Sequence, residues 1–73
     1  MSKLPVVSSR ELIKYLTKKG FKYIRTTGSH HVYKLNDRLV TVPKRKEIGK
    51  GLLVAILEEA GINRDDFIHE WHK

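Results

Sequence analysis

Two adjacent histidines are the residues of this chain best suited to proton-transfer chemistry. His30 and His31 follow Gly28 and Ser29, a pair that is typical of a turn. An imidazole suits acid–base work because its ordinary pKa of about 6.5 lies near working pH. On an RNA substrate such a group would take the proton of a 2′-hydroxyl, which then attacks the neighbouring phosphodiester. DNA lacks that hydroxyl and is expected to resist this chemistry.

Strand alternation distinguishes His30 from its neighbours. A strand that begins at His30 places successive side chains on opposite faces of a sheet, so His31 and Tyr33 point away from His30. Held at the start of a strand beside a turn, His30 has the placement that a general base or a sole acid–base group would need. Hydrogen bonding of His30 to backbone alone is the alternative. His31 is expected to be structural, and Tyr33, whose ordinary pKa near 10 makes it a poor base, is expected to pack.

The charge of the chain points to a polyanionic ligand. Fifteen Lys and Arg oppose eight Asp and Glu, which gives a net charge of +7 for 73 residues. A field of this sign attracts nucleic acid. We predict phosphate contacts from a basic group before the second helix, with a solvated loop as the alternative. The group comprises Lys44, Arg45, Lys46 and Lys50. Arg25 and Lys34 are expected to flank the turn at His30 across paired strands.

Several protein classes are excluded or disfavoured by composition. The chain has no cysteine, so disulfides and Cys-ligated zinc are excluded, and no pair of its four histidines has a recognised metal-ligand spacing. We therefore expect no metal and no cofactor. The apolar runs are too short for a membrane span, and residues 1–5 lack the apolar segment of a signal peptide. These features predict a cytoplasmic protein without a membrane partner.

The elements that position these residues can be predicted from local signals. A single α+β domain over residues 1–73 is expected, with an extended lead-in over 1–7. A capping box at Ser8 and Glu11 predicts a helix over 9–19, and strand signals cover 21–25, 30–35 and 38–42, with turn residues at 26–29 and a proline ending the third strand. An apolar stripe from residue 50 to 60 predicts a second helix, and a short helix is expected from about 63 to 71. The predicted strands should form an antiparallel sheet, with the two longer helices on one face and the other face open. Packing roles are expected for Phe21, Tyr23 and Trp71, with base stacking as the alternative for Tyr23, and no role is assigned to His69 and His72.

Short motifs in a fixed order resemble the HicA toxin family. The central piece is Gly28-Ser29-His30 with an aromatic residue at Tyr33. The further pieces, in order, are residues 16–21, 40–43, 46–51 and 56–62, so the resemblance covers about residues 8–62. It implies a fold like that of a double-stranded-RNA-binding domain. It also implies an mRNA-cleaving toxin (an mRNA interferase) of a type II toxin–antitoxin pair, neutralised by a HicB-like antitoxin.

The resemblance assigns the family's catalytic histidine to His30. Many family members carry another histidine shortly after the proline that ends the third strand, whereas the loop of this chain reads Lys44-Arg45-Lys46-Glu47 after Pro43 and contains no histidine. The identity of the general acid therefore stays open. Two other functions stay open as well: a non-catalytic module that grips structured RNA by shape and phosphate, and a protein-interaction domain with an acidic partner. RNA cleavage in the presence of EDTA would separate the first function from both others.

Overall fold

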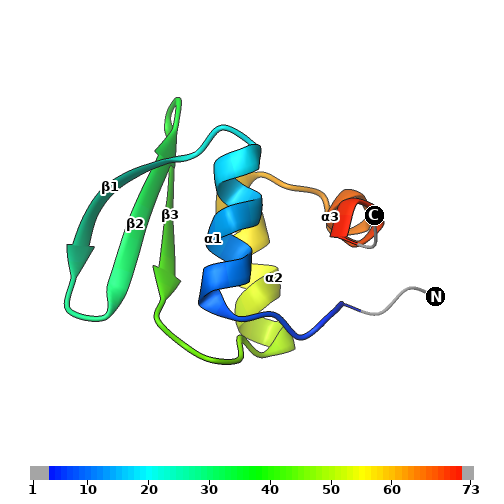
Figure 1. Cartoon of the computed structure of the whole chain (residues 1–73). Coiled ribbons are helices and arrows are strands. Elements are labelled where there is room, and N and C mark those ends of the chain that lie inside the picture. Colours follow the sequence, from blue (N-terminus) through cyan, green and yellow to red (C-terminus); the bar gives the residue numbers. More distant parts are fainter. Residues whose placement is uncertain (1–3, 72–73) are drawn as a thin grey trace.

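The computed structural model describes residues 4–71, which form three helices and one sheet (Figure 1). The elements in chain order are α1 (Ser9–Lys18), β1 (Lys22–Thr27), β2 (His30–Leu35), β3 (Arg38–Pro43), α2 (Lys50–Ala60) and α3 (Arg64–Trp71). The expected α+β arrangement with a three-stranded antiparallel sheet is confirmed. His72 and the first part of the predicted lead-in, residues 1–3, lie outside the described residues.

Helix α1 begins as its capping signal predicts. The Ser8 hydroxyl accepts a hydrogen bond from the Glu11 backbone N–H (3.1 Å), and the Glu11 carboxylate accepts one from the Ser8 N–H (2.9 Å). These two bonds satisfy donors that have no partner inside the helix. The helix ends at Lys18, one residue before its predicted end, and Lys19 forms the C-cap. Gly20 follows with φ +107°, a backbone conformation that side chains disfavour.

The sheet has the order β1-β2-β3, so β2 is central and the other two strands are edges. Strand β1 runs to Thr27, and therefore the prediction of a turn over 26–29 is wrong: Thr26 pairs with His31, Thr27 pairs with His30, and the turn is Gly28-Ser29 alone. Branched threonines favour the extended backbone, which explains the longer strand. Pro43 also pairs with His30 and belongs to β3, where an edge strand tolerates its missing N–H.

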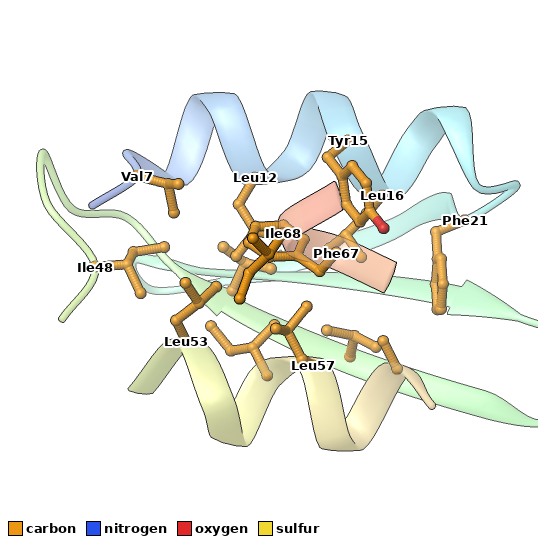
Figure 2. Close-up of a cluster of buried hydrophobic side chains, with 14 residues drawn as sticks. Val7, Leu12, Tyr15, Leu16, Phe21, Ile48, Leu53, Leu57, Phe67 and Ile68 are labelled. Atoms are coloured by element: carbon orange, nitrogen blue, oxygen red, sulfur yellow. The ribbon is translucent and has the colours of Figure 1, made fainter. Parts of the chain in front are cut away.

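The helices form two layers behind the sheet. Helices α1 and α2 cover one face of the sheet and leave the other open, while α3 packs on the far side of these two helices (Figure 1). The core lies between the layers, and α3 contributes Phe67 and Ile68 to it (Figure 2). Phe67 contacts the Tyr15 ring edge-on at 4.9 Å and Trp71 at 5.2 Å. The expected packing of Phe21 and Trp71 is confirmed.

Tyr23 departs from its predicted packing role. Its side chain is 55% exposed, although its ring makes an edge-to-face contact with Tyr33 at a centroid distance of 5.7 Å. The physical reason is the position of β1 at the edge of the sheet, where the ring has a neighbour on β2 and none on a further strand. An exposed aromatic ring of this kind is available to a ligand.

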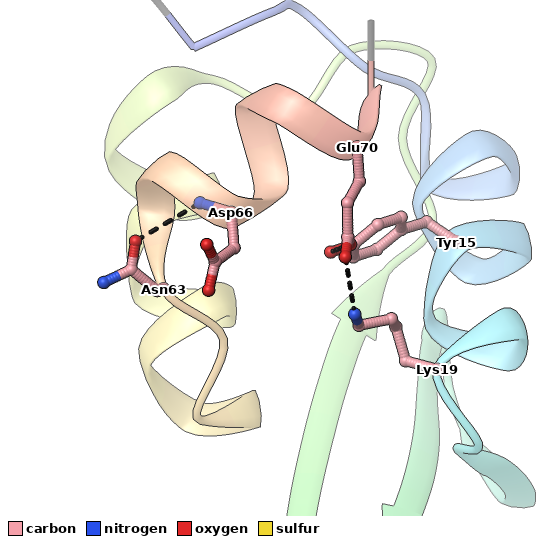
Figure 3. A network of polar contacts seen from close by, with 5 residues as sticks. All are labelled: Tyr15, Lys19, Asn63, Asp66 and Glu70. Atoms are coloured by element: carbon pink, nitrogen blue, oxygen red, sulfur yellow. Dashed lines mark hydrogen bonds and ion pairs between the residues drawn. The ribbon is translucent and has the colours of Figure 1, made fainter. Parts of the chain in front are cut away.

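Polar contacts hold α3 against α1 (Figure 3). The Glu70 carboxylate accepts a hydrogen bond from the Tyr15 hydroxyl (2.6 Å) and lies 3.0 Å from the Lys19 ammonium. Burial of the phenol, followed by its hydrogen bond to Glu70, raises the pKa of Tyr15 above its ordinary value. At its start, α3 is capped by the Asn63 side chain, which accepts from the backbone N–H groups of residues 65 and 66. No helix within residues 4–71 has the length and apolar character needed to cross a membrane.

Candidate nucleic-acid interface

His30 stands at the corner of the sheet where β1 turns into β2. It is the first residue of β2, is exposed, and is paired with Thr27 on one side and Pro43 on the other. Gly28 has φ +61°, a conformation that glycine adopts without strain, and this permits the turn of only two residues before His30. The ladder places the imidazole on the sheet face that the helices leave open.

The structure separates the two adjacent histidines onto opposite faces, as alternation predicts. His31 is half-buried on the helix-covered face, and its Nδ1 lies 3.0 Å from the Thr26 hydroxyl. That hydroxyl lies 2.7 Å from the Tyr23 hydroxyl. Tyr33 shares this face and packs against the core, which confirms its expected packing role. Burial, and secondarily the neighbouring Tyr23, raises the pKa of Tyr33, so even less of this phenol than of a free tyrosine is ionised and available as a base near neutral pH.

The basic loop after β3 is fixed by backbone contacts to two other elements. The Lys44 N–H donates to the Ser29 carbonyl (2.7 Å), directly beside His30. The Ser9 hydroxyl donates to the Arg45 carbonyl (2.9 Å) and accepts from the Arg45 N–H (3.0 Å), and the Ser9 N–H donates to the same carbonyl. The chain therefore holds its cationic loop next to the turn that carries His30.

An open cleft of about 540 Å³ lies where this loop meets the start of α1. It is lined by Ser8, Ser9, Arg10, Lys44, Arg45 and Lys46. Three of the predicted phosphate ligands are thus brought together, and Arg10 joins them although we did not predict it. Its position was a usable signal, because a cation in the first helical turn opposes the helix dipole and suggests a role other than stability.

The other predicted ligands are placed differently. Arg25 is exposed, pairs with Val32, and lies on the same face as His30. Lys34 pairs with Lys22 and Leu39 at the opposite end of β2, four residues from His30, or about 13 Å at the usual strand rise. The prediction that Lys34 flanks the turn is therefore wrong, because the register carries it to the far end of the ladder. Lys50 is exposed at the start of α2 and lines neither this cleft nor the one described below.

Among residues 4–71, no group of three or more His, Asp or Glu side chains is arranged to hold a metal ion. The same residues contain no buried side-chain nitrogen or oxygen that lacks a hydrogen-bond partner. The side chains that lie near the turn at His30 carry cations, hydroxyls, phenols and imidazoles. Such groups can bind an anion and move protons.

The fold and this site define a small α+β domain with one free sheet face and a cationic cleft at one end of the sheet. Residues 9–62 match a family model described as the HicA toxin of bacterial toxin–antitoxin systems, and the chain belongs to this family. The resemblance inferred from short motifs is confirmed. The match ends before α3 begins. No curated protein and no solved structure matches the chain.

Proposed function

We propose that this member of the HicA toxin family is a metal-independent endoribonuclease that cleaves mRNA, with His30 as its catalytic residue. The observation that carries the proposal is the hydrogen bond from the Lys44 N–H to the Ser29 carbonyl. It joins the cationic loop to the turn that presents an exposed imidazole. We propose that a phosphate bound at the loop lies within reach of this imidazole, a group suited to proton transfer.

In this mechanism His30 removes the proton of the ribose 2′-hydroxyl, and the resulting oxyanion attacks the adjacent phosphorus. Negative charge develops on the phosphorane oxygens, where fixed cations stabilise it more than they stabilise the ground state. Lys44 and Arg45 from the loop, and Arg25 from the open face, are the proposed sources of that charge. The same imidazole returns a proton to the leaving 5′-oxygen if it is the sole acid–base group. Lys34, Lys46 and Lys50 are proposed to contact phosphates further along the RNA.

A toxin of this family works within a toxin–antitoxin pair. We propose a HicB-like antitoxin as the protein partner, the cytoplasm as the site of action, and coverage of His30 and the basic loop as the inhibited state. A net charge of +7 suits an acidic partner surface. The antitoxin and RNA would then compete for the same cations.

The test is cleavage of one RNA oligomer by the purified full chain in EDTA, with the DNA oligomer of the same sequence as substrate control. We expect the RNA to be cut and the DNA to survive. His30→Ala should lower the rate by about 10²–10⁴-fold, the usual contribution of acid–base catalysis. His69→Ala, which removes an exposed imidazole from α3, is the matched control and should cleave normally. Circular dichroism would verify that both variants fold. Equal rates in the His30 variant and the wild type would refute the assignment.

One observation favours a second function, a non-catalytic RNA-binding module. Of the imidazoles in residues 4–71, only His30 lies on the open face, since His31 faces the helices and His69 lies on α3. A phosphate on the open face therefore meets one imidazole, whereas cleavage with a separate general base and general acid needs two proton-transfer groups. RNA that binds with a steep salt dependence but stays intact at every pH would establish this alternative.

A further inference from the structure

A second cleft, of about 430 Å³, opens on the helix-covered side of the sheet beside the start of α1. Its walls include two cations, two phenols, a hydroxyl and an imidazole, namely Arg10, Lys44, Tyr23, Tyr33, Thr26 and His31. It adjoins the cleft of the basic loop, because Ser9, Arg10 and Lys44 line both. No acidic side chain is among the described residues that line it. Its volume falls in the range of pockets that take small organic ligands.

The wall of this cleft is held in place by a chain of hydroxyl contacts. The Tyr23 hydroxyl lies 2.7 Å from the Thr26 hydroxyl, which in turn lies 3.0 Å from His31 Nδ1. A ring nitrogen engaged in this way fixes the orientation of the imidazole and leaves the other nitrogen for a ligand. Tyr23 keeps 55% of its surface exposed, so one ring of the cleft is open to stacking.

We propose that this cleft is a nucleotide subsite that binds one residue of the RNA next to the scissile bond. The phosphate lies between Arg10 and Lys44, the base stacks on Tyr23, and His31 donates a hydrogen bond to the bound nucleotide. The inference rests on the proposed ribonuclease function, since it names a second contact of the same substrate. His31 is a binding residue in this scheme, because alternation along β2 points it away from the face that holds His30.

The chemistry of the walls favours a nucleotide over a simple anion or an apolar ligand. Two cations, in a lining whose described residues include no carboxylate, suit a phosphate, and an exposed phenol ring suits the face of any base. The path of a bound strand also fits. Lys44 lines this cleft, and its backbone N–H donates a hydrogen bond to the carbonyl of Ser29, beside His30. An RNA that passes round this end of the sheet therefore meets Lys44 between the subsite and the catalytic imidazole.

The first experiment uses the full chain carrying His30→Ala, so that RNA cleavage cannot interfere. Each of the four ribonucleoside 5′-monophosphates and inorganic phosphate are titrated separately while NMR follows the ring signals of His31 and Tyr23. We expect the nucleotides to move both sets of signals and inorganic phosphate to leave the Tyr23 ring unmoved. Equal shifts with phosphate alone, or nucleotide shifts confined to other residues, would overturn the subsite.

The second experiment measures affinity for a single-stranded RNA oligomer as a function of salt. Arg10→Ala should weaken binding about tenfold, the loss expected for one charge-assisted contact. It should also reduce the slope of log affinity against log salt by about 0.7, the value for one phosphate contact on a single strand. Arg64→Ala, which removes the same charge from exposed α3, is the control and should change neither quantity. Identical effects of the two arginine variants would overturn the proposal.

Two tyrosine variants separate stacking from the hydroxyl chain. Tyr23→Leu should weaken RNA binding about tenfold through loss of a stacked base, whereas Tyr23→Phe keeps the ring and should bind nearly as wild type.

The experiments distinguish failure of the nucleotide subsite from failure of the proposed ribonuclease activity. If the wild type never cleaves RNA but nucleotides still move the Tyr23 and His31 signals, only the catalytic proposal fails. If RNA is cleaved while Arg10→Ala matches Arg64→Ala, only the subsite fails.

Discussion

Substitution of Ser9 by alanine tests whether the cationic loop must be held in place. Ser9 is the one buried polar residue among residues 4–71, with 7% of its surface exposed. Its hydroxyl makes two hydrogen bonds with the Arg45 backbone, at 2.9 and 3.0 Å, and both are lost in Ser9→Ala. Each such bond contributes about 0.5–1.5 kcal/mol, so the free energy of unfolding should fall by about 1–3 kcal/mol. For a chain of this size each kcal/mol lowers Tm by about 4–8 °C.

Asn63→Ala provides the control. It removes the side chain that caps α3, which costs about 0.5–2 kcal/mol, and Asn63 lines neither cleft. Thermal unfolding followed by circular dichroism should therefore show both variants destabilised to a similar degree. RNA affinity should distinguish them. Only Ser9→Ala loosens the loop, which then keeps its backbone hydrogen bonds to Ser9 and Ser29 but loses the two made by the Ser9 hydroxyl. Re-ordering the loop on binding should weaken affinity about fivefold, equivalent to about 1 kcal/mol. The reasoning is refuted if the two variants bind RNA equally well.

Two further predictions concern the turn before His30 and the contact between α1 and α3. At Gly28, φ is +61° and an added Cβ would meet no atom within 4 Å. Gly28→Ala should therefore lower the free energy of unfolding by about 1–2 kcal/mol through backbone strain alone, and Gly28→Asn should lower it by less. Equal urea midpoints for the two variants would contradict this. At Tyr15, burial and the Glu70 hydrogen bond raise the pKa, so the folded chain keeps the phenolic proton more tightly than the unfolded chain. Its stabilisation is complete below about pH 10 and is lost as pH rises through the raised pKa. Tyr15→Phe should therefore lose less stability than the wild type as the pH rises above about 10, and parallel losses in denaturant titrations would oppose the argument.

Local signals account for the parts of the fold that were predictable from sequence. The Ser8–Glu11 capping box and the left-handed Gly61 (φ +71°) act within one helical turn of the residues they influence, and they delimit α1 and α2 closely. The two-residue period of β2 likewise predicted that His30 and His31 lie on opposite faces. Each of these signals acts through the backbone conformation of residues that are close in sequence, so no long-range contact is needed to interpret it.

Long-range contacts explain what the sequence left undetermined. The exposure of Tyr23 depends on β1 being an edge strand, and the distance from Lys34 to His30 depends on the register of the ladder. Neither property is encoded next to the residue concerned. The position of Arg10 in the first helical turn was a local signal, but the cleft that it lines forms only when the loop after β3 is hydrogen-bonded to Ser9, which lies 36 positions away from Arg45 in the chain. The catalytic role of His30 stays a prediction, because the fold places the imidazole and does not reveal its reaction.

Helix α3, which forms the layer furthest from the sheet, offers a physical reason why the sheet face that carries His30 can stay open. A domain of about this length buries only about 60% of the surface of its unfolded chain, so its stability is marginal. Full burial of an aromatic side chain such as Phe67 contributes about 1.5–3 kcal/mol, and Ile68 adds to it. Helix α3 supplies this burial behind α1 and α2, away from the sheet (Figure 1). Because the extra apolar area is gained on that side, no element has to cover the open face, and the charged residues there remain free to meet a ligand.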